Sequence, residues 1–203
     1  MKQYFALCML LLMGVTAQAQ EFKPFKVNVS LGGAVPSGGG GILFAVEPKY
    51  GISDQIDIGL RIEAAAMARD VIINGNTTSG NAQGAYSYLL TGNYMLSDQN
   101  FRPFVGIGAG LFGIASTSFT ATGSGSTTQS NNGSIAAGTV FGGMARVGFK
   151  TGHFVLGVEY NLVPNTTSLL LDDQGNAQIG TTVQSKNSYV GIKLGFDIGG
   201  GRR

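Results

Sequence analysis

A strict two-residue alternation of apolar and polar side chains is the feature that most constrains this chain. In Ile56–Met67, isoleucine and leucine occupy the even positions from 56 to 62, while aspartate, glycine, arginine and glutamate occupy the odd positions from 57 to 63. A period of two is that of a β-strand, whose successive side chains point to opposite faces. The same alternation recurs in Phe154–Leu162 and Val190–Phe196. The pattern predicts an all-β chain.

Weaker alternation elsewhere brings the expected number of strands to about eight. The connections between strands alternate in length. Those at 53–55, 97–100 and 151–153 are short and polar, whereas those at 36–40, 70–82, 117–134 and 165–185 are mostly longer and rich in Gly, Ser, Thr and Asn. Short periplasmic turns and long extracellular loops are typical of antiparallel, up-and-down transmembrane β-barrels. The weaker segments are Lys26–Gly32, Ile42–Ile52, Tyr86–Leu96, Phe101–Ala115 and Ile135–Phe149.

Residues 1–20 have the order of a secretory signal peptide. Lys2 precedes an apolar run from Tyr4 to Val15, and small or polar residues follow up to Gln20. The run is shorter than the roughly 20 residues that a transmembrane helix needs, so we expect it to be cleaved, leaving residues 21–203 as one barrel domain. Cys8, the only cysteine, lies in this run, so the mature chain has no thiol for a disulfide or a metal.

Charge distinguishes between two kinds of barrel. The chain holds 13 basic and 11 acidic residues, a near balance that argues against nucleic acid as a partner. Charged residues make up 12% of the chain, well below the roughly 25–35% of a soluble surface. A soluble, lipocalin-like barrel would place the apolar face inside and the charges outside. The scarcity of charge favours the opposite arrangement, with the apolar face in contact with lipid.

The polar face would then line the lumen. An eight-stranded barrel is just wide enough for its own side chains to fill it, and buried ions are tolerated when they are paired. We therefore predict a salt-bridged plug that closes the lumen, the alternative being a narrow water-filled lumen. The expected interior charge network has four acids and four bases: Glu47, Lys49, Asp57, Arg61, Glu63, Arg146, Glu159 and Lys193.

Aromatic residues gather where the short turns and the two ends of the barrel domain are expected. By the alternation they fall on the apolar face, where the aromatic girdle of a membrane interface must point. Tyr86 and Tyr88 are the best candidates for a thinner girdle at the other end. The expected periplasmic girdle comprises Phe25, Tyr50, Tyr94, Phe101, Phe149, Phe154 and Phe196.

The stretch Arg102–Gly110 (RPFVGIGAG) is similar to the glycine-rich fifth strand of the small eight-stranded outer-membrane β-barrel family. The resemblance covers nearly all of Phe25–Ile198 and implies a bacterial outer-membrane location. It also implies contact with outer-membrane lipids, lipopolysaccharide and the barrel-assembly machinery. One departure is at the C-terminal end, because members commonly finish on an aromatic residue, whereas here seven residues follow Phe196.

The sequence offers little for catalysis, so we expect no catalytic, cofactor-binding or metal site. Gly108–Gly113 matches G-x-G-x-x-G but lacks the following helix that a dinucleotide site needs. The single histidine, His153, falls in a short turn, away from the outer rim where a general base would be needed. Asp172 and Asp173 stand next to each other in a long connection, and two neighbouring acids are only a weak signal of cation binding. We expect a structural or surface-interaction role through the loops, above all 117–134. The alternatives are passive transport of small or hydrophobic solutes and, less favoured, an envelope enzyme.

Overall fold

A computed structural model of the chain describes residues 22–73, 76–114, 117–122, 130–135, 138–171 and 177–202. The predicted signal peptide and the acidic pair Asp172 and Asp173 lie outside this part. All regular structure in the described part is β-strand. The strands are β1 (Phe22–Pro36), β2 (Gly41–Gly51), β3 (Ile56–Ile73), β4 (Asn76–Met95), β5 (Phe101–Ile114), β6 (Thr117–Thr122), β7 (Ser130–Ile135), β8 (Gly138–Thr151), β9 (Phe154–Leu162), β10 (Thr166–Leu171), β11 (Ala177–Ser185) and β12 (Tyr189–Arg202).

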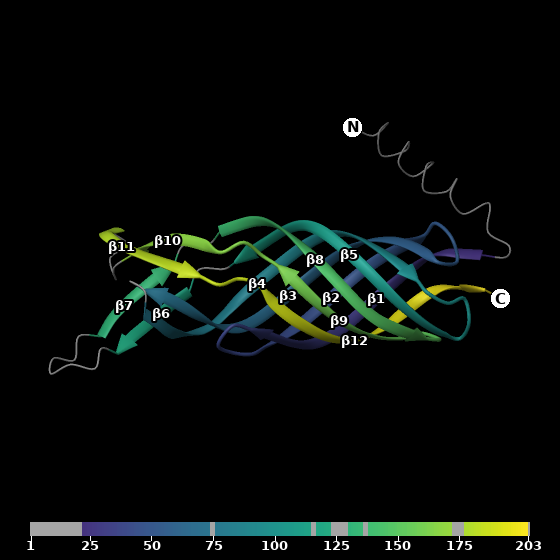
Figure 1. Cartoon of the computed structure of the whole chain (residues 1–203), viewed down its shortest axis with the longest axis horizontal. Coiled ribbons are helices and arrows are strands. Elements are labelled where there is room, and N and C mark those ends of the chain that lie inside the picture. Colours follow the sequence, from purple (N-terminus) through teal and green to yellow (C-terminus); the bar gives the residue numbers. More distant parts are fainter. Residues whose placement is uncertain are drawn as a thin grey trace, which may run out of the picture.

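Eight of these strands form a closed antiparallel barrel. Going round the barrel, the order is β1, β2, β3, β4, β5, β8, β9 and β12, and β12 pairs with β1 to close the ring. Figure 1 shows these strands running obliquely around the long axis, with both ends of the described chain at one end of the barrel. The turns at 52–55, 96–100 and 152–153 lie at this end, which we call the short-turn end. The predicted all-β, eight-stranded barrel is thus confirmed.

The long connections contain strands, where the sequence predicted loops. β3 and β4 continue as a paired ribbon up to Ile73 and Asn76. β6 pairs with β7 and β10 with β11, and β11 joins β3 through Val183 and Ile73. Figure 1 shows these strands projecting beyond the barrel at the end opposite the short turns. Sheet hydrogen bonds join backbone groups and need no apolar face, so polar segments can extend a sheet without showing the alternation.

The barrel strands also run further than the alternation predicted, most clearly at the C-terminal end. β12 continues past Phe196 to Arg202 and pairs there with Phe22 and Lys23 of β1. The pairing shifts register between Lys23 and Lys26, opposite Gly199 and Gly200, whose φ angles are 81° and 68°. Positive φ is favourable for glycine and not for other residues, so these glycines allow the bulge.

The two faces of the barrel wall are opposite in character. On β3, Ile56, Ile58 and Leu60 are exposed on the outside, while Asp57 and Arg61 are buried inside. Large apolar side chains are exposed on every barrel strand. A continuous apolar band of this kind is unfavourable in water and is the surface of a lipid-facing barrel. The soluble alternative, with its charges outside, is therefore wrong. No helix in the described part of the chain is long and apolar enough to cross a membrane.

The lipid-facing role of the wall can be tested at Leu90, which is 68% exposed and pairs with Leu60 on β3. We expect Leu90→Arg to lower the free energy of unfolding by about 2–4 kcal/mol, because an arginine loses its hydration in the hydrocarbon. Unfolding in phospholipid vesicles measures this. The matched control is Gln99→Arg in the exposed 96–100 turn, for which little change is expected. Equal, small effects of both substitutions would contradict a lipid-facing wall.

Candidate functional site

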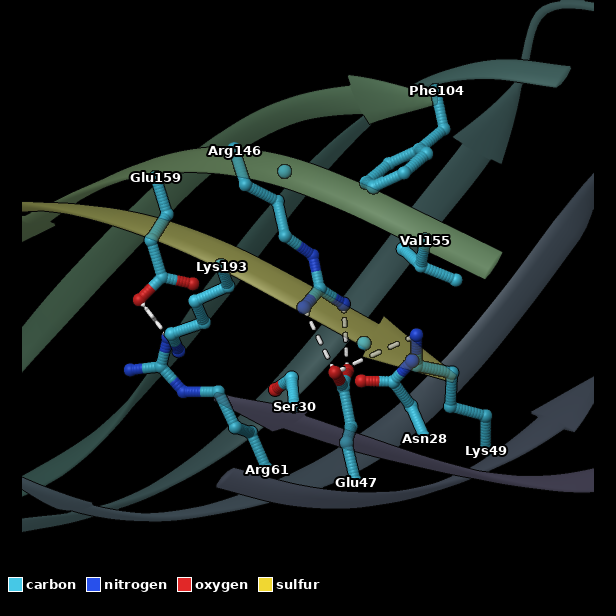
Figure 2. Close-up of a pocket in the computed structure, with 12 residues that line it drawn as sticks. Asn28, Ser30, Glu47, Lys49, Arg61, Phe104, Arg146, Val155, Glu159 and Lys193 are labelled. Atoms are coloured by element: carbon cyan, nitrogen blue, oxygen red, sulfur yellow. Dashed lines mark hydrogen bonds and ion pairs between the residues drawn. The ribbon is translucent and has the colours of Figure 1, made fainter. Parts of the chain in front are cut away.

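The barrel interior holds a chain of buried ion pairs, which we call the polar cluster. At its centre is Glu47 of β2. Its carboxylate accepts two hydrogen bonds from the guanidinium of Arg146, of 2.6 and 2.8 Å, and a third of 2.5 Å from the hydroxyl of Thr91. The ammonium of Lys49 lies 3.6 Å from the same carboxylate (Figure 2). Two-point Arg–carboxylate contact fixes both side chains across the lumen, from opposite walls of the barrel.

A second group of pairs centres on Arg61 of β3. Its guanidinium donates to Glu159 at 2.7 Å and to Asn161 at 2.9 Å, both on β9. Lys193 of β12 bridges Glu159, at 2.8 Å, and Glu63. These contacts join β3, through the middle of the barrel, to the neighbouring strands β9 and β12 on the other side. Glu63 also accepts a hydrogen bond of 2.7 Å from the hydroxyl of Tyr189.

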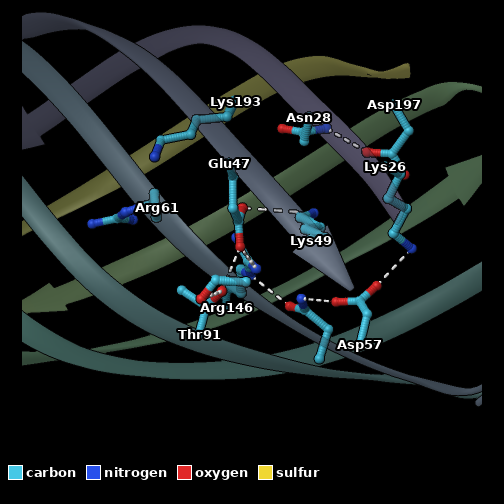
Figure 3. Close-up of polar contacts among 12 residues, drawn as sticks. Lys26, Asn28, Glu47, Lys49, Asp57, Arg61, Thr91, Arg146, Lys193 and Asp197 are labelled. Carbon is cyan, nitrogen blue, oxygen red and sulfur yellow. Dashed lines mark hydrogen bonds and ion pairs between the residues drawn. The ribbon is translucent and has the colours of Figure 1, made fainter. Parts of the chain in front are cut away.

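The third group lies towards the short-turn end. Asp57 pairs with Lys26 at 2.7 Å (Figure 3). The side-chain amide of Asn93 donates to Asp57 at 2.5 Å, and its oxygen accepts a hydrogen bond of 2.7 Å from Arg146. Through Arg146, this group is connected to Glu47. Asp197 pairs with Lys150 at 2.5 Å and accepts from Asn28 at 2.9 Å. Burial of these carboxylates is offset by the paired cations and amides.

All eight charged residues expected inside the barrel lie there, and each takes part in an ion pair. The polar cluster contains three further charged residues that were not predicted, Lys26, Lys150 and Asp197. The alternation itself could have found them, because Asp197 continues the inward positions 193 and 195 of β12, and Lys150 continues 146 and 148 of β8. Lys150 and Asp197 were missed because the predicted strands ended at Phe149 and Phe196, one residue too early, whereas Lys26 begins the predicted strand Lys26–Gly32 and was passed over.

The aromatic residues expected at the periplasmic interface lie at the short-turn end. Phe25, Tyr50, Tyr94, Phe101 and Phe196 are exposed on the outer face, and Phe149 and Phe154 are half-buried. Neighbouring rings touch across strands, with centroids 5.3 Å apart for Phe101 and Phe149 and 5.8 Å apart for Phe154 and Phe196. Their contact with lipid headgroups stays a prediction. Tyr86 and Tyr88 are exposed on the outer face of β4.

The single histidine and the glycine-rich motif lie in a turn and in the barrel wall, respectively. His153 is exposed in the turn between β8 and β9, with its Nδ1 2.7 Å from the carbonyl oxygen of Asp197. Gly108–Gly113 lies within β5, and no helix follows it in the described chain. No group of three or more His, Cys, Asp or Glu residues in the described part could hold a metal ion. The described polar groups of the interior thus bond mainly to one another.

Little free space remains in the polar cluster. The cavity bounded by Glu47, Arg61, Arg146, Glu159 and Lys193 leaves about 30 Å³ for the centres of water molecules (Figure 2). One water needs about 10–15 Å³ on this measure, so the space suits about two. Phe104 and Val155 border the same cavity on the other side. A cavity of this size does not make a continuous water-filled pore.

Comparison with known proteins agrees with this architecture. No protein-family model and no curated protein matches the chain. Among solved structures, the outer membrane protein OprG from Pseudomonas aeruginosa aligns with a TM-score of 0.57 and 11% identity, over 88% of this chain and 97% of that one. A major outer membrane protein from Thermus thermophilus aligns with a TM-score of 0.50 and 16% identity, over 86% and 99%. The outer membrane enzyme PagL aligns with a TM-score of 0.38 and 14% identity, over 83% and 97%.

The chain therefore has the fold of the small bacterial outer-membrane β-barrels. With its apolar outer face, this fold indicates the bacterial outer membrane as its location.

Proposed function

We propose that the protein is a closed, non-catalytic barrel with a structural role in the outer membrane, which holds its strand-built extension outside the cell for surface contact. One observation carries the proposal: the lumen is filled by its own side chains, and five carboxylates pair there with six cationic groups. Outer-membrane lipids, lipopolysaccharide and, during insertion, the barrel-assembly machinery are the proposed partners.

The small free space in the lumen supports the absence of a channel role. Pairs such as Arg61–Glu159, whose side chains are only 1% and 4% exposed, hold opposite strands together across the lumen and leave little space between them. Breaking a buried pair costs about 3–5 kcal/mol when one partner is left uncompensated. The non-enzymatic part of the proposal rests on His153, which lies exposed at the short-turn end, away from the polar cluster's centre.

Single-channel recording tests the closed lumen. The purified protein, folded and inserted into planar lipid bilayers, is expected to show no steady conductance. The cavity among the described residues leaves only about 30 Å³ for the centres of water molecules, which is too little for a continuous water-filled path. Heat-dependent mobility on a gel, boiled against unboiled, selects the folded preparation. Large, steady conductance from that preparation would replace the structural role with passive transport of small solutes.

A further inference from the structure

Beyond the polar cluster, towards the end with the long connections, the inner face of the barrel changes from polar to apolar. Leu43 of β2, Met67 of β3, Leu89 of β4, Phe112 of β5 and Met144 of β8 are almost completely buried and pack together. Each lies on the inward-facing side of its strand. We call these residues, together with Ala34, Val163 and Tyr189, the apolar layer.

Three residues complete the apolar layer on the remaining strands. Ala34 comes from β1, Val163 directly follows β9, and Tyr189 begins β12. Every one of the eight barrel strands, or its immediate continuation, therefore contributes one buried apolar or aromatic side chain. The hydroxyl of Tyr189 points towards the polar cluster, where it donates to Glu63. The apolar layer thus occupies the whole circumference of the lumen, and Tyr189 marks its boundary with the ion pairs.

The order of the two layers is the same on β2, β3 and β8, whereas on β4 Leu89 lies between Thr91 and Ser87, which bond to Glu47 and Arg61. On β2, Leu43 lies nearer to the long connections than Glu47; on β3, Met67 lies nearer than Arg61. On β8, Met144 lies nearer than Arg146. An ion crossing the barrel would therefore meet both layers in succession.

The two layers differ in how they can hold water. The polar cluster has room for about two waters and offers them hydrogen-bonding groups. The gap between Glu63, Phe112, Val163 and Tyr189 leaves about 10 Å³, the lower limit for a single water. Apolar constrictions exclude ions by remaining dry, because an ion cannot shed its hydration shell without replacement groups.

We infer that the apolar layer, and not the salt-bridge network, is the seal of this barrel. The inference rests on the proposed closed lumen and assigns the closure to particular residues. The ion pairs fix the shape of the wall by joining strands across the lumen. The apolar layer separates the polar cluster from the outer end, so the polar cluster is accessible to water from the short-turn end alone.

The test compares two double variants, one in each layer. Met67→Gln with Leu89→Asn makes the apolar layer polar, whereas Glu47→Gln with Arg146→Gln removes the central ion pair. In planar bilayers, folded Met67→Gln/Leu89→Asn protein is expected to show conductance steps that wild type lacks. The Glu47→Gln/Arg146→Gln protein is expected to stay closed. Steps from the ion-pair variant with none from the apolar-layer variant would overturn the inference, whereas steps from wild type would overturn the proposed function instead.

A second measurement uses only mild substitutions, in case the polar variants do not fold. Ser30→Cys places a thiol beside the polar cavity, and Gln99→Cys places one in an exposed turn as a marker of the short-turn end. The protein is folded into vesicles, and silver ion (Ag⁺), which reacts with thiols, does not cross lipid and is about the size of a water molecule, is supplied from one side at a time. Ser30→Cys is expected to react only from the side on which Gln99→Cys reacts. Reaction of Ser30→Cys from the opposite side would show that the apolar layer does not seal the lumen.

Discussion

Replacing Arg61 with alanine is expected to lower the free energy of unfolding of the barrel by about 3–5 kcal/mol, the cost of leaving buried carboxylates without their partner. The Arg61 side chain is 1% exposed, and its guanidinium contacts Glu159, Asn161 and Ser87. After the substitution, Glu159 would keep only Lys193 as a cation, and Lys193 also serves Glu63. The chain has no tryptophan, so unfolding in vesicles is followed by circular dichroism and by the heat-dependent gel shift.

Two further variants separate loss of the pair from loss of a large side chain. Arg102→Ala removes an arginine at the short-turn end that bonds only to the backbone oxygens of Asp98 and Gln99, and we expect a change within about 0.5 kcal/mol. Arg61→Met combined with Glu159→Met removes both charges and keeps apolar volume, so it should destabilise less than Arg61→Ala. An Arg61→Ala barrel as stable as wild type would mean that these pairs do not support the wall.

The charged part of the interior was predictable because it obeys the alternation. Glu63 and Glu159 stand at inward positions between apolar outward residues, so their burial and pairing followed from strand geometry and from the cost of isolated buried charge. The actual partners were not predictable. Which inward residues meet depends on the register between strands such as β3 and β9, which do not pair with each other.

The apolar layer was missed for the opposite reason. Leu43 and Leu89 are apolar residues at inward positions, so both faces of their strands are apolar near the long connections and the period of two disappears. In the sequence, this loss of alternation weakens the strand pattern of Ile42–Ile52 and Tyr86–Leu96. In the barrel it is the sign of an inner face that changes from polar to apolar along its length. The strands of the extension were missed because they lie in segments rich in Gly, Ser, Thr and Asn, a composition that predicts loops.

The glycines of β5 are explained by the neighbouring backbone, and Gly110 is the sharpest case. A Cβ atom there would lie 2.0 Å from the carbonyl oxygen of Tyr88 on the adjacent strand β4, far inside the contact distance. Backbone cannot rotate away as a side chain can, so β4 and β5 would have to separate over the pair Leu89–Gly110. The repeated glycines that mimic a nucleotide-binding motif thus permit close strand approach in the wall.

Gly110→Val is therefore expected to prevent formation of the closed barrel, a larger effect than the roughly 1–3 kcal/mol of ordinary overpacking. The readout is the fraction of protein that shows the heat-dependent gel shift after refolding into vesicles. Gly92→Val is the matched control on β4, because a Cβ at Gly92 meets nothing within 4 Å; this protein should fold like wild type. If both valine variants fold equally well, the strands can part at little cost, and close packing of β4 against β5 is not what requires glycine at position 110.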